Sequence, residues 1–157
     1  MLKALIAAAT ILGSAYPAHG LDDPDQLVRA IYDAKSLPTT ELDSDRILAR
    51  DASAAYKLQL KADEPKPATD FDWRYDSQEW EITDLVISRG SNPAFRDGRT
   101  FSDVTVTFKN FGKPETVVWT LCLGVSGWRV ADVKGGDGEG AWTLRELLEI
   151  PPGEVQC

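Results

Sequence analysis

The chain has 157 residues and one histidine, and its 25 acidic side chains against 17 basic ones give a formal net charge of −8. Nucleic acids and anionic lipid surfaces attract cationic proteins, so this charge argues against both as partners. The length suits one domain with its own core.

The first twenty residues have the pattern of a secretory signal peptide. A basic start precedes the apolar run 4–15, and small residues follow up to Gly20. This order is typical of export signals, and the run is too short to span a bilayer. We predict a leader over residues 1–20, cleaved after Gly20 or else after Ala18. The alternative is a buried N-terminal helix, for which the run lacks a polar face.

Cleavage would leave a single exported domain over residues 21–157, without His19. We expect it in the periplasm of a Gram-negative bacterium or secreted, and not attached to a membrane. A chain without histidine cannot perform Ser-His-Asp or Cys-His catalysis or bind zinc through histidine. The sequence also shows no nucleophile motif, so we assign no catalytic residue and expect no cofactor.

Hydrophobic periodicity places helices in the first part of the domain. Residues 22–36 combine helical spacing with acids and a proline at the start, which favours a helix beginning there. A second predicted helix begins near Asp43 and extends past Leu60, with acids at its start and lysines near its end.

A period of two then predicts four strands joined by turns, over residues 80–88, 102–108, 116–123 and 128–133. Residues 142–149 predict a short C-terminal helix, with Thr143 as its cap and Glu146 three residues on. We therefore predict an α+β domain. Its N-terminal helices pack on a curved four-stranded antiparallel sheet.

Cys122 and Cys157 are the two cysteines. In an oxidising compartment an even pair indicates a disulfide, which would stabilise the fold by about 3–4 kcal/mol in the chain-entropy model. The other interpretation leaves Cys122 buried and reduced, with Cys157 exposed and open to pairing between molecules.

The segment GGDGEG, residues 135–140, has the glycines and acids of a ligand-binding loop. Its acids argue against phosphate, which they would repel. Asp132, Asp137 and Glu139 offer oxygens to calcium, but their spacing matches no standard calcium loop. We predict no metal site and interpret the segment as a solvated corner between a strand and a helix.

The segment FDWRYDSQEWEITDL, residues 71–85, crowds aromatic and acidic side chains together. Asp70, Asp72 and Asp76 offer a paired-carboxylate or hard-metal site. Asp76 with Glu79 also fits the cap and first-turn acid of a short helical turn, which we favour. Aromatic side chains with a few polar groups line ligand pockets, although at strand spacing they are also ordinary core. Our candidate ligand-binding residues are Trp73, Tyr75, Asp76, Trp80, Trp119 and Trp128.

Four segments together resemble bacterial exported domains of unknown function of the family numbered 3828. They are LVRAIYDA, FDWRYDSQEWEITDL, VTVTFKNFGKPETVVWTL, and GWRVADV followed by WTLRELLE. The resemblance covers most of residues 27–149. It implies a cystatin-like, nuclear-transport-factor-two-like cone, in which helices pack in a curved sheet that often holds a cavity. It also implies that Asp76, Gln78, Trp80 and Asp84 lie near one end of the sheet. It supplies no catalytic residue, and such a fold hosts both enzymes and binding modules.

Three functions follow as hypotheses. The first is a non-enzymatic binding module that holds a small ligand in an aromatic-lined cavity. The second is an acidic, immunity-type inhibitor of a basic exported toxin, whose charge would speed association. The third is an enzyme that uses Asp76 or Asp84 with Tyr75, which needs a carboxyl group of raised pKa. The expected partner is accordingly an unknown small molecule or a basic protein.

Overall fold

The structure is a computed structural model that describes residues 22–34, 37, 40–91 and 93–157. The predicted leader, its cleavage site and His19 lie outside these residues. Within the described part, no helix is both long enough and apolar enough to cross a membrane.

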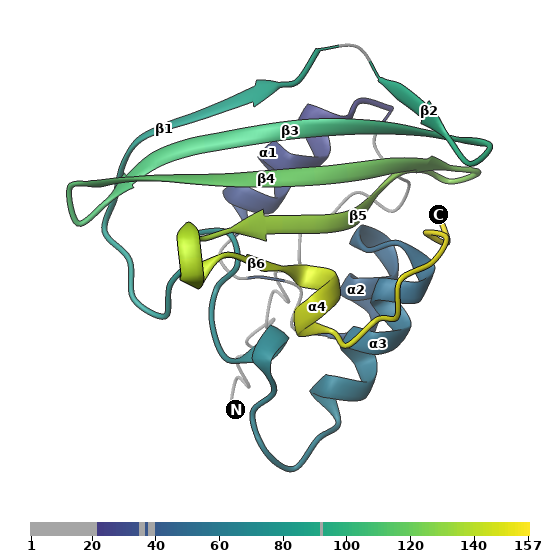
Figure 1. The fold of residues 1–157 in the computed structure, drawn as a ribbon, viewed down its shortest axis with the longest axis horizontal. Coiled ribbons are helices and arrows are strands. Elements are labelled where there is room, and N and C mark those ends of the chain that lie inside the picture. The colour runs from purple at the N-terminus through teal and green to yellow at the C-terminus, as the bar shows by residue number, and fades with distance from the viewer. Residues whose placement is uncertain (1–21, 35–36, 38–39, 92) are drawn as a thin grey trace, which may run out of the picture.

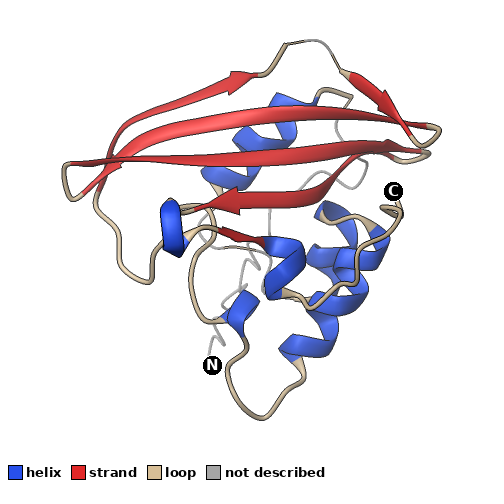
Figure 2. Ribbon diagram, in the orientation of Figure 1, coloured by secondary structure: helices blue, strands red, loops and turns tan. Residues whose placement is uncertain are grey.

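Helices and an antiparallel sheet form two layers, with the helices on one side of the sheet (Figures 1 and 2). The helices are α1 Pro24–Asp33, α2 Glu41–Ile47, α3 Arg50–Leu60 and α4 Leu144–Leu147, with 3-10 turns η1 Pro67–Thr69 and η2 Gly138–Gly140. The strands are β1 Ile82–Arg89, β2 Ala94–Arg96, β3 Arg99–Asn110, β4 Lys113–Gly124, β5 Gly127–Gly135 and β6 Trp142–Thr143. The strand order is β1-β3-β4-β5-β6, and β2 also pairs with β3. The predicted α+β class and antiparallel sheet are confirmed.

The sheet has six strands where we predicted four, because two short strands escaped the periodicity. β2 lies between the predicted strands 80–88 and 102–108, where Asp97 and Gly98 adopt positive φ and close a hairpin onto β3. β6 takes the first two residues of the expected C-terminal helix and pairs with the end of β5. Such short strands carry too few residues for an alternation to be visible.

The inner face of the sheet, which faces the helices, carries the core. In the central strands Val104 pairs with Trp119, Trp119 with Val133, and Val106 with Val117, and all five positions are fully buried. Residues paired across strands point to the same face, so these positions form one continuous apolar surface.

The second predicted helix is wrong, because the chain forms two helices that are interrupted at Leu48 and Ala49. Leu48 forms a parallel bridge with Val130, and the Ala49 N–H donates to the Val130 carbonyl at 2.8 Å. Leu48 and Ala49 therefore pair with the edge of β5 instead of continuing the helix, and the Val130 carbonyl of β5 gains a hydrogen-bond donor. Both residues are apolar and buried, which is why helical periodicity did not show the break.

The predicted cap at Thr143 is confirmed, although the helix after it is shorter than predicted. The Thr143 Oγ1 accepts from the Glu146 N–H at 3.2 Å, and Glu146 Oε2 accepts from the Thr143 N–H at 3.1 Å. The segment 135–140 is a corner between two strands, β5 and β6, and not between a strand and a helix. Gly136 turns this corner at a φ of +69°, which favours glycine.

The predicted disulfide is confirmed. Cys122 and Cys157 are bonded, with their Cα atoms 6.0 Å apart. Because side chains alternate along β4, Cys122 lies on the outer face of the sheet, opposite Trp119. The C-terminal tail therefore passes onto the outer face, where Val155 and Cys157 pack on a small buried cluster with Phe101. The Arg50 N–H donates to the Gln156 carbonyl at 2.7 Å and holds the tail against α3.

Candidate functional site

Aromatic side chains fill the space between the helices and the inner face. Trp73 and Trp119 are both 0% exposed, and their ring centroids are 5.6 Å apart. Tyr32 packs edge-on against Trp119 at 5.8 Å, and Tyr56 packs against Trp73 at 6.4 Å. Aromatic pairs at such distances are in direct contact. Trp73 and Trp119 therefore lie where we expected a cavity, and their rings pack on one another there.

The segment 71–78 forms a loop, which we call the aromatic loop, that inserts Trp73 and Arg74 under α1. Asp72 and Ser77 close it with paired backbone hydrogen bonds of 3.0 and 3.4 Å. The Tyr32 hydroxyl donates to the Arg74 carbonyl at 2.6 Å and accepts from the Trp119 indole N–H at 3.3 Å. These bonds tie α1, the loop and β4 together.

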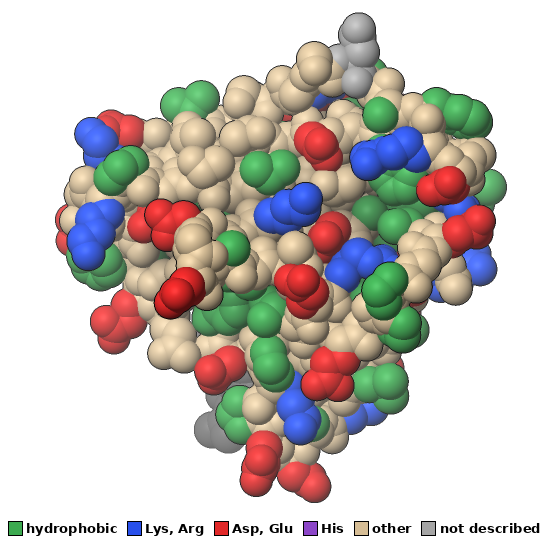
Figure 3. Space-filling view, in the orientation of Figure 1, with side chains coloured by type: hydrophobic (Ala, Val, Ile, Leu, Met, Phe, Trp, Pro, Cys, Tyr) green, Lys and Arg blue, Asp and Glu red, His purple; other side chains and the backbone are tan. Residues whose placement is uncertain are grey.

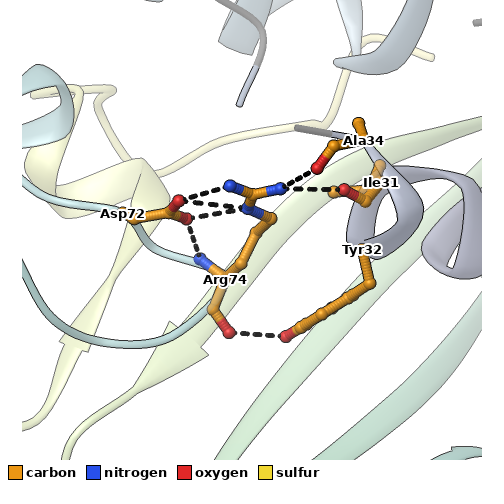
Figure 4. A network of polar contacts seen from close by, with 5 residues as sticks. All are labelled: Ile31, Tyr32, Ala34, Asp72 and Arg74. Carbon is orange, nitrogen blue, oxygen red and sulfur yellow. Dashed lines mark hydrogen bonds and ion pairs between the residues drawn. The ribbon is translucent and has the colours of Figure 1, made fainter. Parts of the chain in front are cut away.

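Arg74 is 1% exposed, and its side chain holds the loop to the end of α1 (Figure 4). Its Nε and Nη2 donate to the Asp72 carboxylate at 3.0 and 2.6 Å. Its Nη1 donates to the carbonyls of Ala34 at 2.7 Å and Ile31 at 3.3 Å. These carbonyls at the C-terminal end of α1 need donors, and a cation suits that end of the helix dipole. No pattern in the sequence indicates this role, since the contacts with α1 join residues about forty positions apart.

We call the packed rings of Tyr32, Tyr56, Trp73 and Trp119 the aromatic layer. Two of the candidate residues lie at its rim. Tyr75 contacts Tyr32 and Phe108 edge-on, with centroids 5.7 and 5.9 Å apart. On its other side it packs on Trp80 at 5.2 Å. Trp80 is 44% exposed and precedes β1, so this ring is accessible to solvent. The Arg74 guanidinium lies 5.0 Å from the Tyr75 ring centroid, which is a cation–π distance.

The predicted helical turn at Asp76 and Glu79 is wrong. Asp76 has a φ of +53° and begins the return of the aromatic loop. Its Oδ1 accepts from the Trp142 indole N–H at 2.5 Å. The Ser77 hydroxyl donates to the Glu79 carbonyl at 2.5 Å, which stabilises a turn of a different kind. A partner on β6, far along the chain, thus determines the position of the Asp76 carboxylate.

Trp128 lies apart from the other candidates. It is buried at the start of β5, and its indole N–H donates to the Asp22 carbonyl at 3.2 Å, just before α1. The six candidate residues therefore do not form one site. Trp73 and Trp119 lie at the centre of the core, Tyr75 and Trp80 lie at its rim, and Asp76 lines a pocket.

This pocket, which we call the rim pocket, has a volume of about 540 Å³. It is lined by Pro67, Asp70, Phe71, Asp76, Ser77, Gln78 and Leu147. Phe71 packs edge-on against Trp142 with centroids 5.1 Å apart, so one aromatic wall is fixed. Gln78 Nε2 donates to Asp70 Oδ2 at 3.3 Å. Among the described residues, neither Asp70 nor Asp76 forms an ion pair.

The three acids that we grouped as a carboxylate or metal site are separated by their partners. Asp72 is engaged by Arg74, whereas Asp70 and Asp76 share the rim pocket. Within the part of the chain that the structure describes, no three acidic, histidine or cysteine side chains are placed to hold a metal ion. The rim pocket therefore presents two carboxylates beside an aromatic ring.

Among the described residues, the carboxyl group whose pKa is raised lies outside this pocket. Desolvation raises the pKa of Asp132, although its Oδ1 accepts from the N–H groups of Val133 and Arg145 at 2.9 and 3.0 Å. Asp84 is exposed and pairs with Lys109 at 2.8 Å. Burial raises the pKa of Tyr75. The structure thus brings no carboxyl group of raised pKa to Tyr75 among the residues it describes.

Compared with models of known protein families, with characterised proteins and with solved structures, the chain matches none of them. The resemblance to family 3828 therefore stays a prediction, and the rim pocket has to be interpreted from its own chemistry.

Proposed function

We propose that the protein is an exported, non-enzymatic binding module that holds a small organic cation in the rim pocket. One observation carries this proposal: Asp70, Asp76 and the Phe71 ring line the same pocket of about 540 Å³. Neither carboxylate forms an ion pair among the described residues. Small-molecule sites commonly have volumes of about 300–1,000 Å³ and combine apolar walls with a few fixed polar groups.

The chemistry of the pocket favours a cation over a neutral or anionic ligand. Two carboxylates attract an ammonium group, and an aromatic ring adds a cation–π contribution of about 0.5–1 kcal/mol at exposed sites. The Trp142 indole fixes the Asp76 carboxylate before any ligand arrives, so little ordering is needed on binding. We expected the ligand in an aromatic-lined cavity inside the domain, and we now propose that it binds at the edge of the aromatic layer.

Export and the cone fold belong to the same proposal. The Cys122–Cys157 disulfide suits an oxidising compartment such as the periplasm or the exterior. Helices followed by a long antiparallel sheet that packs on them support the cystatin-like, nuclear-transport-factor-two-like cone. In such a cone an internal cavity is optional, and here aromatic rings occupy the interior.

Calorimetric titration with benzylamine tests the proposal, with benzyl alcohol as the neutral probe of the same shape. We expect benzylamine to bind with a Kd in the millimolar range or below, and benzyl alcohol to bind at least about tenfold more weakly, because a charged hydrogen-bonded contact is worth more than 1.4 kcal/mol. Asp70→Asn and Asp76→Asn should each weaken benzylamine binding by about fivefold or more.

Asp63→Asn is the matched control, because it removes the same charge from an exposed position outside the pocket. Equal loss of affinity in Asp63→Asn and Asp70→Asn would attribute the effect to net charge and contradict a built site. Equal affinity for the two probes would contradict cation recognition.

A basic protein partner is the second candidate, and the corner between β5 and β6 favours it. Asp137 and Glu139 are exposed there and form no ion pair among the described residues. Acidic side chains are also spread over the face shown in Figure 3. An immunity-type inhibitor would use such charges to speed association. A basic exported protein retained by the native chain and by Asp63→Asn, but lost by the Asp137→Asn/Glu139→Gln variant, would support this function.

A further inference from the structure

A second pocket, which shares no residue with the rim pocket, lies where the β4–β5 turn meets α3 and the C-terminal tail. It has a volume of about 240 Å³. Its polar walls include Arg50 and Ser53 of α3, the turn 124–127, Arg129 of β5 and Cys157. We call it the arginine pocket.

The fold builds this pocket from segments that are fixed to one another. The disulfide attaches Cys157 to β4, and the Arg50 N–H holds the preceding residue of the tail at 2.7 Å. At Gly124 a Cβ atom would lie 2.7 Å from the Cys157 carbonyl oxygen, closer than such atoms pack. Glycine at this position lets the tail lie against the turn. The walls are therefore in place before a ligand arrives.

Two arginines line the arginine pocket, and neither forms an ion pair with a carboxylate among the described residues. Arg129 Nη1 donates to the carbonyls of Ser126 at 3.3 Å and Trp128 at 3.0 Å. None of the ion pairs among the described residues includes Arg50 or Arg129. Partial burial lowers the pKa of Arg129, as expected for a cation that has lost water and gained no counterion.

One acid also lines the pocket, and its charge is already compensated. Asp45 pairs with Lys57 at 2.7 Å and accepts from the Ser53 hydroxyl at 2.5 Å. The hydrogen bond from Lys57 and then that from Ser53 lower the pKa of Asp45. Among the side chains that line the pocket, two arginines therefore face one acid, which leaves a local positive charge in a chain whose net charge is −8.

We propose that the arginine pocket binds a small, doubly charged oxyanion such as phosphate. Guanidinium groups present paired N–H donors that match the oxygens of phosphate or carboxylate, and two guanidinium groups match two charges. The volume of about 240 Å³ holds one such anion together with several waters, each of about 30 Å³. The site rests on geometry separate from that of the rim pocket, so either proposal can fail without the other.

Titration of the native chain with inorganic phosphate at constant ionic strength and pH 7.5 tests this site, by calorimetry and by the arginine Nε–H signals in NMR spectra. We expect a Kd in the millimolar range or below, and weaker binding of singly charged acetate. Arg129→Gln and Arg50→Gln should each weaken phosphate binding by about tenfold.

Arg46→Gln is the control, because Arg46 is also outside every ion pair of the described residues but does not line the pocket. Unchanged phosphate binding in Arg46→Gln is the expected result. A loss equal to that of Arg50→Gln, or no binding by the native chain, would overturn the proposal. Arg50 is exposed, so Arg50→Gln keeps the test valid if Arg129→Gln does not fold.

Discussion

The inner and outer faces of the sheet are built by the same strands but have different environments. On β3, Val104 and Val106 point inward and are fully buried, whereas the alternate residues Thr105 and Thr107 face outward and reach solvent. The inner face is covered by helices and by aromatic rings in contact. On the outer face, the C-terminal tail packs on Phe101, and a large part of the remaining surface is open.

This difference shows where ligands have room to bind. A face that is packed to the density of a protein interior resists any added atom. Both pockets described above lie at margins, where loops meet the ends of the helices and strands. We therefore propose that ligands bind at the rim of this protein, which the aromatic layer positions.

The largest expected effect is at Arg74, on the inner side. Arg74→Ala would leave the Asp72 carboxylate, whose side chain is 9% exposed, without its cation and the end of α1 without its donors. Breaking a buried pair from one side costs about 3–5 kcal/mol, so we expect that loss in the free energy of unfolding from urea denaturation. Arg96→Ala, which removes an exposed arginine from the Phe101 ring, should cost less than about 1 kcal/mol. Similar losses in both variants would contradict the account of the inner side.

Removal of the disulfide, on the outer side of the sheet, should cause the next largest loss of stability. The disulfide joins residues that are 35 positions apart, which corresponds to about 3–4 kcal/mol in the chain-entropy model. The Cys122→Ala/Cys157→Ala variant should lose that amount of stability in urea denaturation, and Phe101 should become accessible as the tail detaches. A loss below about 1 kcal/mol would show that the tail is held by packing alone.

The same substitution, valine to alanine, can be made on the inner face of the sheet and on its exposed edge, so the two environments can be compared directly. Val106 is 0% exposed and Val86, on the edge strand β1, is 55% exposed. Val106→Ala should cost about 2 kcal/mol through lost burial and the cavity it leaves. Val86→Ala should change stability by no more than about 0.5 kcal/mol. Equal effects in thermal or urea unfolding would refute the assignment of the two environments.

The smallest expected effect is the dependence of stability on alkaline pH. Desolvation, and to a lesser extent the charge of Asp72, raise the pKa of Tyr56 to about 12, and burial also raises that of Tyr32. A raised folded pKa means that the folded state holds its proton more tightly. The contribution of the Tyr56 hydroxyl to the free energy of unfolding is therefore complete below about pH 10, the pKa of tyrosine in the unfolded chain. It is lost as the pH rises through about 12, the pKa in the folded state. We expect unfolding free energy to fall by about 1–2 kcal/mol for Tyr56 between these values, and a flat profile would contradict its burial.

The elements that depend on local pattern were predictable from the sequence. Alternation along β3 and β4, the cap at Thr143 and the pairing of Cys122 with Cys157 each leave a signal in neighbouring residues or in a count. The elements decided by distant contacts were not predictable. The edge of β5 breaks the helix at Leu48, and no residue near Leu48 indicates that edge.

The rim pocket also combines features that have a local sequence signal with features that depend on distant contacts. Asp76 was identified from its segment, yet its position comes from the Trp142 indole, and the pocket is closed by Leu147 of α4. The sequence around Arg74 does not indicate its role, because α1, whose carbonyls it satisfies, lies about forty positions away along the chain. Pockets at the margins of a fold combine residues from distant segments, so a sequence pattern can name a member but not the site.

Indole N–H signals of the tryptophans in a proton–nitrogen NMR spectrum test the central claim, that ligands bind at the rim and not within the aromatic layer. The chain has five tryptophans, so each position reports separately. On titration with benzylamine, we predict a shift of the Trp142 signal, because its N–H donates to Asp76, and unchanged signals of Trp73 and Trp119. Shifts of Trp73 and Trp119 with an unchanged Trp142 signal would place the ligand in the core and contradict it.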